Sequence, residues 1–319
     1  MERKLSVKPT KPNELTGVIP ILPTPFSEDG EIDEAGFRKV IDAAIVGGVH
    51  GLAMFGLASE YAKLADAEKV RLTQILVEQT GKRVPVIVSI THHSLEVARK
   101  EAAEAMQIGA DALMIMPPFF MAPSMEAVQN HIAVITADTA APVIVQYAPI
   151  QTGANLTAEI FAALHQEHPN LAYVKVDVVP SGPMISRLQS IAGESLKAMV
   201  GYMGLHLPHD VGRGAVAVMP TVSLGHAFVA LFGLLKSDPE QGRRLHERLL
   251  PMLNFMMQSV EMLIAVEKLL LQRRGLLTSA YCRSPKWTLD AMHIAELDRL
   301  CLDLKDLLPF ATATKGEIA

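Results

Sequence analysis

The residue of this chain best suited to chemistry is a single lysine. Lys175 is the only charged residue in the apolar run 171–176, which reads Leu-Ala-Tyr-Val-Lys-Val. A short run rich in β-branched residues is typical of a buried strand. Burial disfavours an ammonium ion and favours the neutral amine, which can attack a carbonyl group and form a Schiff base. The ordinary alternative is a lysine at a strand end whose stem carries the ammonium group to water.

A second cluster of polar residues has to be weighed as a metal site. His206 and His209 stand three positions apart, and Asp210 follows. Pro208 is expected to interrupt any helix there, and no further ligand stands nearby in the sequence. The two cysteines, Cys282 and Cys301, show neither a disulfide framework nor a metal-ligand spacing. No metal is therefore expected.

The composition excludes several classes of function. The chain has 319 residues, half of them hydrophobic, and a formal net charge of −5. It is long enough to bury a barrel-sized core, and its charge leaves no basic footprint for nucleic acid. Nothing at the N-terminus resembles a signal peptide, and no apolar stretch reaches membrane-spanning length. We expect a cytoplasmic protein with neither nucleic acid nor membrane as partner.

The elements that position Lys175 follow a regular alternation. Short apolar runs expected to be strands cover residues 17–22, 51–56, 84–90, 112–117, 142–147, 172–177, 198–202 and 215–219. Helical periodicity fills most of the gaps, at 34–46, 66–80, 94–107, 124–136 and 158–165. Strands that alternate with helices pair in parallel, and eight of them close a (β/α)8 TIM barrel. A doubly wound open sheet is the rival, but the glycine fingerprint of its dinucleotide-binding form is missing after the first strand.

Four regions follow from this α/β reading. Residues 1–15 form an N-terminal tail, and residues 16–225 form the barrel with the active site. Residues 226–308 form a C-terminal helical region, with helices expected at 228–236, 239–274 and 294–307. Residues 309–319 form a second tail.

The active site of such a barrel lies at the C-terminal ends of its strands. If Val174 and Val176 face the helices, alternation points Lys175 into the barrel. An apolar residue would fill that layer at less cost, so a structural role explains the lysine poorly. The other strand ends offer the turn 56–60, the pair His92-His93, Phe119-Phe120, Gln146-Tyr147, Gly201-Tyr202 and Met219.

On these residues the chain resembles the dihydrodipicolinate synthase and N-acetylneuraminate lyase family of class I aldolases, from about residue 17 to residue 300. The resemblance is carried by Thr24-Pro25-Phe26, the turn 56–60, the segment 109–112, Pro149 with Thr152-Gly153, and Val174-Lys175. It implies that Lys175 forms an imine with the ketone of a 2-oxo acid such as pyruvate. The imine is an electron sink, so no cofactor besides this covalent adduct is expected.

The chain departs from the family at its proton relay. The family uses a strand-five tyrosine, a threonine in the strand-two turn and a tyrosine after strand four from a neighbouring subunit. The aligned residues here are Gln146, then Leu57 and Ala58, then Phe120. Gln151 replaces the arginine that holds a second carboxylate in the family. The chain is thus identified as a divergent member, and true dihydrodipicolinate synthase activity is not expected.

The predicted catalytic residues are Lys175, Gln146 and Tyr147. Gln146 can position a water molecule or an imine but cannot exchange protons as a tyrosine does. Tyr147 reaches the cavity only if a bulge turns it inward; otherwise it packs against helices. Asp177 faces the same side as Lys175, where it could hydrogen-bond within the barrel or hold the lysine in its charged form.

The predicted substrate-binding residues surround this centre. They are Gly56, Ala58, Ser59, His92, Phe120, Gly201, Tyr202 and Met219. The backbone amides near Ala58 and the Ser59 hydroxyl suit a carboxylate. Either His92 or its neighbour His93 could act as a general acid or base, and a surface loop with two histidines is an equal alternative.

The leading hypothesis is a Schiff-base lyase acting on a 2-oxo acid, as an aldolase or as a dehydratase of a 2-keto-3-deoxy sugar acid. Leu57, Phe119, Phe120 and Met219 favour a less polar or aromatic aldehyde as the other reactant. A catalytically silent family member with a binding role is the alternative from another class. The resemblance also implies a homo-oligomer, either a dimer or a tetramer.

Overall fold

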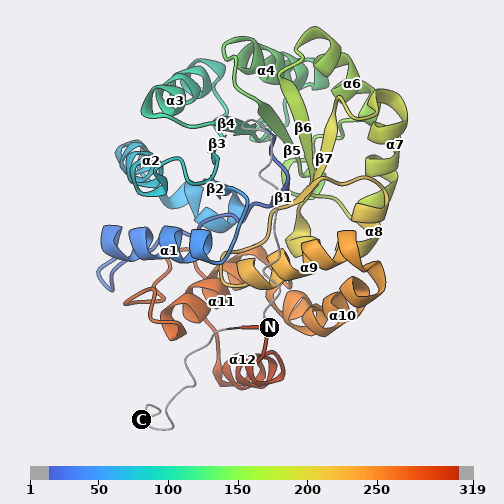
Figure 1. Cartoon of the computed structure of the whole chain (residues 1–319). Helices are drawn as coiled ribbons and strands as arrows, with labels where there is room; N and C mark the ends of the chain where they lie inside the picture. Colours follow the sequence, from blue (N-terminus) through green and yellow to red (C-terminus); the bar gives the residue numbers. More distant parts are fainter. Residues whose placement is uncertain (1–13, 309–319) are drawn as a thin grey trace.

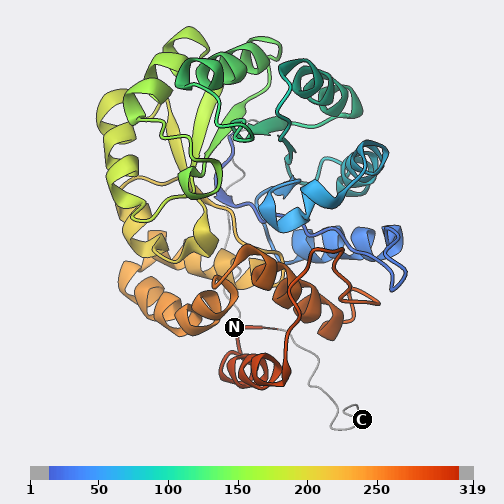
Figure 2. The same cartoon turned by 180° about the vertical axis from the view of Figure 1, so that it is seen from behind.

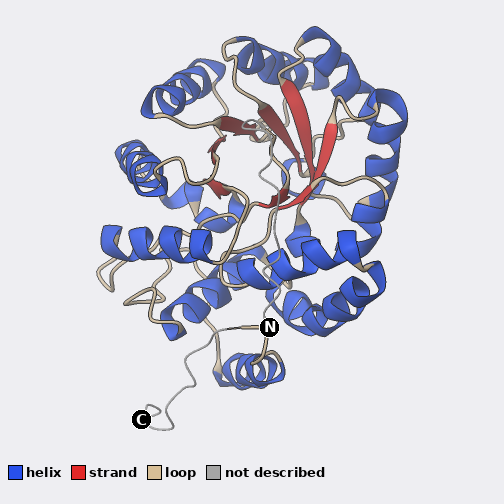
Figure 3. Ribbon diagram, viewed as in Figure 1, coloured by secondary structure: helices blue, strands red, loops and turns tan. Residues whose placement is uncertain are grey.

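The protein is described by a computed structural model covering residues 14–308 (Figure 1). Eight parallel strands form one sheet in the order β1-β8-β7-β6-β5-β4-β3-β2. Ile21 joins the two ends of this order, because it bridges Ala53 in β2 and Thr221 in the loop after β8. Figure 3 shows the strands in red surrounded by helices in blue, and Figure 2 shows the same arrangement from behind. The predicted (β/α)8 barrel with a helical C-terminal region is confirmed.

The strands are shorter than the apolar runs that predicted them. Their bounds are β1 Gly17–Val18, β2 Leu52–Met54, β3 Val86–Ile90, β4 Ala112–Ile115, β5 Val143–Tyr147, β6 Leu171–Val176, β7 Lys197–Val200 and β8 Ala217–Val218. The apolar residues left over, such as Met219, continue into the loops at the C-terminal ends. Those loops are where the pocket described below is built.

The expected barrel helices are present. They are α1 Glu34–Val46, α2 Asp66–Thr80, α3 Leu95–Ile108, α4 Met125–Ala137 and α6 Ala158–Glu167. Four of them begin at a side-chain cap, since Asp33, Ser94, Ser124 and Thr157 each accept a hydrogen bond from a backbone N–H in the first turn. Such caps satisfy donors that the helix itself leaves free.

Three further helices lie in segments for which no helix was predicted. They are α5 Pro149–Thr152, α7 Gly182–Ala192 and α8 Leu207–Gly212. The expectation that Pro208 interrupts a helix is wrong, because Pro208 lies in the first turn of α8. A proline is tolerated there, where its missing N–H has no acceptor within the helix.

Two layers of apolar side chains follow from strand alternation. The inner layer fills the barrel and includes Ile144, Tyr173 and Met199. The outer layer, between strands and helices, includes Val174 and Val176. Lys175 therefore stands on the inner face of β6, above Tyr173, as alternation predicts.

The C-terminal region contains α9 Gly225–Ser237, α10 Pro239–Met256, α11 Val260–Arg273 and α12 Ala291–Asp303. The single helix expected over 239–274 is wrong, because α10 and α11 are separated by residues 257–259 and bend by 114°. Ser259 is extended and caps α11 by accepting the Met262 N–H. Within residues 14–308 no single helix is long and apolar enough to cross a membrane; α10 and α11 pass that test only as a bent pair.

Leu15, the last residue of the predicted N-terminal tail, belongs to the barrel. Leu15 is buried, and its N–H donates a hydrogen bond of 3.0 Å to the Tyr173 hydroxyl inside the barrel. The expected tail over 1–15 is therefore wrong at its last residue. Residues 1–13 of that tail and the whole of the predicted tail 309–319 lie outside the described residues.

Candidate active site

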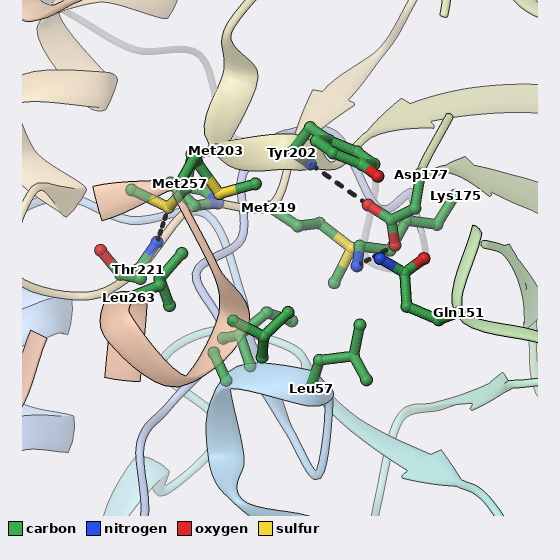
Figure 4. A pocket seen from close by; sticks show the side chains of 14 residues that line it. Leu57, Gln151, Lys175, Asp177, Tyr202, Met203, Met219, Thr221, Met257 and Leu263 are labelled. Atoms are coloured by element: carbon green, nitrogen blue, oxygen red, sulfur yellow. Dashed lines mark hydrogen bonds and ion pairs between the residues drawn. The ribbon is translucent and has the colours of Figure 1, made fainter. Parts of the chain in front are cut away.

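A pocket opens at the C-terminal ends of the strands, between the barrel and the C-terminal helices (Figure 4). It contains about 570 Å³ of space free of protein atoms, including the part open to solvent, which suits a small molecule. The residues that line it are Ile21, Leu57, Ala58, Gln151, Lys175, Asp177, Tyr202, Met203, Met219, Pro220, Thr221, Met257, Val260 and Leu263. Lys175 and Asp177 are the only charged residues among them.

Lys175 and Asp177 form a buried ion pair on the inner face of the barrel. Lys175 Nζ donates to Asp177 Oδ2 at 2.6 Å, and each side chain is 7% exposed. Asp177 stands two positions after Lys175, so the two side chains leave the chain on the same side. At this distance the carboxylate can accept a proton from the lysine when the amine reacts.

Gln146 lies next to this pair. Its Nε2 donates to Asp177 Oδ2 at 2.6 Å, and it is fully buried. Gln146 Oε1 has no hydrogen-bond partner in the described part of the chain, and the same holds for Oε1 of Gln151, which lines the pocket. Figure 4 shows the Gln151 side chain directed toward the Lys175–Asp177 pair. Both amides therefore keep an unused acceptor oxygen within the described residues.

Gly201 makes room for the Asp177 carboxylate. A Cβ atom added at Gly201 would collide with Asp177 Oδ1. The next residue, Tyr202, lines the pocket, and its N–H donates to the same oxygen at 3.2 Å. Tyr202 and Met203 have φ values of 47° and 52°, which is uncommon for residues with a side chain. Such conformations gather at functional sites, where the surrounding structure holds them.

The turn after β2 supplies another wall. Leu57 and Ala58 begin a short 3-10 helix, Leu57–Ser59, so their N–H groups have no acceptor within it. Gly56 precedes this helix and has an extended backbone. A Cβ atom added at Gly56 would lie 3.1 Å from the Ile21 side chain, so the backbone packs closely there. The structure does not bring Ser59 to the pocket, because its hydroxyl donates to Leu22 O at 2.6 Å and accepts the Phe55 N–H at 3.0 Å.

A buried ion pair fixes this turn to the C-terminal region. Glu60, the residue that ends the turn, has a fully buried side chain and pairs with Lys268 on α11. Lys268 Nζ also donates to Tyr281 O at 2.8 Å and lies 4.2 Å from the centre of the Phe26 ring. Burial lowers the pKa of Lys268, and Glu60 opposes this shift. Glu60 therefore ties the turn to α11.

Three residues predicted for the site lie elsewhere. Tyr147 packs in the outer layer, with its ring 5.6 Å from that of Phe161, because no bulge turns it inward. His92 accepts the Ser94 N–H at 3.0 Å in the loop before α3. Phe120 is 67% exposed. In the structure of residues 14–308, none of the three lines the pocket that contains Lys175.

Sequence reasoning missed the side of the pocket formed by the C-terminal region. Met257 lies in the break between α10 and α11, and Val260 and Leu263 lie in the first turns of α11. The sequence predicts one continuous helix over 239–274, and in such a helix these residues form only an apolar stripe. Ser259 was the available signal, since a serine before an apolar run is typical of a helix start.

No group of three or more His, Cys, Asp or Glu side chains suited to a metal ion is found within residues 14–308. Two residues of the His206–Asp210 segment have other partners. The buried Asp210 accepts the Ser181 hydroxyl hydrogen at 2.6 Å. His209 Nε2 accepts a hydrogen bond from Arg213 Nε at 2.9 Å.

Comparison with known proteins gives one consistent result. The model of the Dihydrodipicolinate synthetase family matches residues 14–302. A 4-hydroxy-tetrahydrodipicolinate synthase of Salinibacter ruber is 31% identical over 240 residues, 74% of this chain and 78% of that protein. An L-2-keto-3-deoxyarabonate dehydratase of Azospirillum brasilense is 31% identical over 208 residues, 64% of this chain and 67% of that protein. The solved 4-hydroxy-tetrahydrodipicolinate synthase of Methylacidiphilum fumariolicum superposes with a TM-score of 0.86 at 23% identity, covering 93% of this chain and 98% of that one.

Proposed function

Because the chain belongs to the dihydrodipicolinate synthetase family of class I aldolase-type lyases, we propose that it holds a 2-oxo acid such as pyruvate as an imine on Lys175. The observation that carries this proposal is the placement of Lys175 inside the barrel, in a pocket of suitable size and 2.6 Å from a carboxylate. A buried lysine with a base beside it is the arrangement that Schiff-base chemistry needs.

The first half of the reaction follows from these contacts. Asp177 takes a proton from the Lys175 ammonium, and the neutral amine adds to the ketone carbon of the 2-oxo acid. A proton of the added nitrogen passes to the ketone oxygen, which becomes a hydroxyl group. Asp177 then returns a proton to the hydroxyl of the adduct, which leaves as water and gives the imine. The hydrogen bonds from Gln146 and from the Tyr202 N–H hold the carboxylate in place during both transfers.

The second half uses the imine as an electron sink. Loss of a proton from the carbon next to the imine, or cleavage of a bond to that carbon, gives an enamine. Asp177 is the charged group available to carry the proton. We assign the substrate carboxylate to the N–H groups of Leu57 and Ala58, in the turn to which the family resemblance assigns that role; these N–H groups have no acceptor within the short helix.

Synthesis of dihydrodipicolinate itself is not the reaction we propose. The residues at the family's relay positions, Gln146, Leu57 and Phe120, carry no hydroxyl group. Gln151 occupies the position of the arginine that receives a second carboxylate, and a neutral amide cannot balance that charge. Two reactions remain: aldol cleavage or addition with an aldehyde, and dehydration of a 2-keto-3-deoxy sugar acid.

The dehydratase is supported by one relative, the Azospirillum brasilense enzyme named for 2-keto-3-deoxyarabonate. Dehydration requires a proton to leave one carbon and a hydroxyl to leave the next. A single carboxylate such as Asp177 can serve both steps, first as base and then as acid.

We also propose that a second copy of the chain covers the loop after β4. Phe120 and Met121 there are 67% and 86% exposed, and Ile150 at the start of α5 is 67% exposed. Large apolar side chains at neighbouring strand ends are typical of a protein–protein contact. The family resemblance implies that this loop reaches a neighbouring subunit.

The test of the main proposal is borohydride reduction in the presence of pyruvate, read by intact mass and peptide mapping. We expect a stable adduct on Lys175 and its loss in Lys175→Met. Lys197→Met on β7, a lysine paired with Glu14 outside the pocket, is the matched control and should keep the adduct. No adduct in folded protein with pyruvate or any other 2-oxo acid would refute the proposal and favour a catalytically silent binding protein.

A further inference from the structure

Glu267 on α11 is a fully buried carboxyl group that the proposed chemistry does not use. It accepts the Ser223 N–H at 2.9 Å and the Ser223 hydroxyl hydrogen, and the nearby Thr221 hydroxyl helps to lower its pKa. Arg274 adds positive charge nearby and donates to Ser223 O at 3.3 Å. Burial raises the pKa of Glu267, and the hydrogen bonds oppose that shift. A buried carboxyl group is costly unless it is hydrogen-bonded, and here its donors come from the loop that forms one wall of the pocket.

The hydrogen bonds fix the direction of the Thr221 hydroxyl. Each hydroxyl group has a single hydrogen to donate. Ser223 Oγ gives its hydrogen to Glu267, so Thr221 is the donor in the 3.5 Å contact between Thr221 Oγ1 and Ser223 Oγ. The Thr221 hydrogen therefore goes to Ser223 or Glu267, neither of which lines the pocket.

Thr221 itself does line the pocket. Figure 4 shows its oxygen turned away from Lys175. Its N–H contacts the Met203 sulfur at 3.3 Å, and Met203 belongs to the same wall. The neighbouring groups are Met219, Met257 and Leu263, which are all apolar. The part of the pocket away from Lys175 and Asp177 is therefore an apolar surface, although it contains a threonine.

We propose that Glu267 is a positioning residue for substrate selection: it holds the Thr221 hydroxyl out of the pocket, so that this wall receives an apolar extension of the 2-oxo acid. The inference rests on the proposed imine at Lys175 and names the class of 2-oxo acid bound there. A carboxylate at the far end of the substrate would be buried without a cation, since Lys175 is the only cationic side chain lining the pocket within residues 14–308. The expected substrates end in an uncharged, apolar group.

The experiment compares imine trapping by borohydride with three acids: pyruvate, 4-methyl-2-oxopentanoate and 2-oxoglutarate. Each rate is divided by the rate of the same acid with free butylamine, which removes differences in intrinsic reactivity. The selectivity is then the corrected rate of each longer acid relative to pyruvate. For the natural sequence we expect 4-methyl-2-oxopentanoate to equal or exceed pyruvate, and 2-oxoglutarate to fall at least about tenfold below it.

Two substitutions test the role of Glu267. In Glu267→Gln the amide nitrogen donates instead of accepting, so a hydroxyl loses its acceptor and turns toward the pocket. We expect the selectivity for 4-methyl-2-oxopentanoate to fall about tenfold. The Thr221→Val variant has no hydroxyl at this position. Adding Glu267→Gln to that variant should therefore leave its selectivity unchanged. Glu240→Gln, the same substitution at an exposed position of α10 away from the pocket, is the control.

The outcomes separate the two proposals. No imine with any of the acids would overturn the proposed function. An imine with pyruvate but no preference for the apolar acid over 2-oxoglutarate would overturn this inference alone. The inference would also fail if Glu267→Gln changed the selectivity equally in the natural sequence and in Thr221→Val. If Glu267→Gln fails to fold, Thr221→Ser keeps the hydroxyl but removes the methyl group. We then expect about a threefold loss of selectivity, and an unchanged value would overturn the inference.

Discussion

Asp177 connects three strands of the barrel at one carboxylate. It belongs to the strand end of β6, accepts from Gln146 on β5, and accepts the Tyr202 N–H after β7. Its carboxylate also accepts a hydrogen bond from Lys175 at 2.6 Å, the contact that the proposed proton transfer requires. From the sequence alone, Asp177 could oppose Schiff-base formation by holding Lys175 in its charged form. In the described structure Asp177 is instead the carboxylate in contact with Lys175 Nζ, and so the nearest proton acceptor.

The fit of Asp177 depends on the absence of a side chain at Gly201. In Gly201→Ala the new methyl group would occupy the position of Asp177 Oδ1, so the carboxylate has to move away from Lys175. We expect the rate of imine trapping with pyruvate to fall about 100-fold, the usual weight of one acid–base group. Gly212→Ala in α8, where an added Cβ meets nothing within 4 Å, is the matched control. Equal trapping rates in both variants would show that the position of Asp177 is unimportant.

At the scale of elements, α11 organises the pocket from outside the barrel. Its consecutive residues Glu267 and Lys268 are both fully buried, and each contacts a loop that lines the pocket. Lys268 pairs with Glu60 in the turn after β2, and Glu267 binds Ser223 in the loop after β8. The helix therefore fixes two walls while its own first turns supply a third.

The Lys268–Glu60 pair makes a prediction for stability. In Lys268→Met the Glu60 carboxylate loses its main buried partner, and removing one member of a buried pair typically costs about 3–5 kcal/mol. We expect a decrease of that size in the free energy of unfolding, measured by chemical denaturation. Arg243→Met removes an exposed pair with Glu240 and should leave the free energy nearly unchanged. Equal effects of the two substitutions would contradict a structural role for the buried pair.

Helix α4 carries a prediction about pH. Burial, with the nearby charges of His93 and His92, lowers the pKa of His131 from 6.5 to about 4. Between these values the unfolded chain binds a proton at this residue and the folded chain does not, so unfolding is favoured as the pH falls. The stability that the folded protein gains from a neutral His131 is fully present above about pH 6.5, and it is lost as the pH drops toward about 4.

His131→Leu should remove this part of the pH dependence. The free energy of unfolding of the natural sequence should decrease more steeply between pH 6.5 and 4 than that of the variant, by at most about 1.4 kcal/mol per pH unit. Denaturant titrations of both proteins across this range measure the difference. Parallel curves would show that folding does not lower the pKa of His131.

At the scale of the whole molecule, the barrel could be predicted from the sequence, because each strand is a separate apolar run. The inward direction of Lys175 followed from alternation alone. The wall formed by Met257, Val260 and Leu263 could not be predicted, since it depends on a 114° bend inside one apolar segment. The predicted catalytic role of Tyr147 required a bulge that turns its side chain into the barrel. Strand alternation instead places the Tyr147 ring against Phe161.

The exposed apolar loop after β4 makes the final prediction. Phe120 and Met121 are 67% and 86% exposed and do not line the described pocket, so their exposure is hard to explain in an isolated chain. We expect a dimer or tetramer by sedimentation at micromolar concentration, and dissociation in Phe120→Asp with Met121→Asp, because two charges would be buried at the contact. Met292→Asp on α12, at a position 79% exposed, is the control and should leave the assembly intact. A monomer in the natural sequence would contradict this assignment without affecting imine formation at Lys175, since every group proposed for that step comes from one chain.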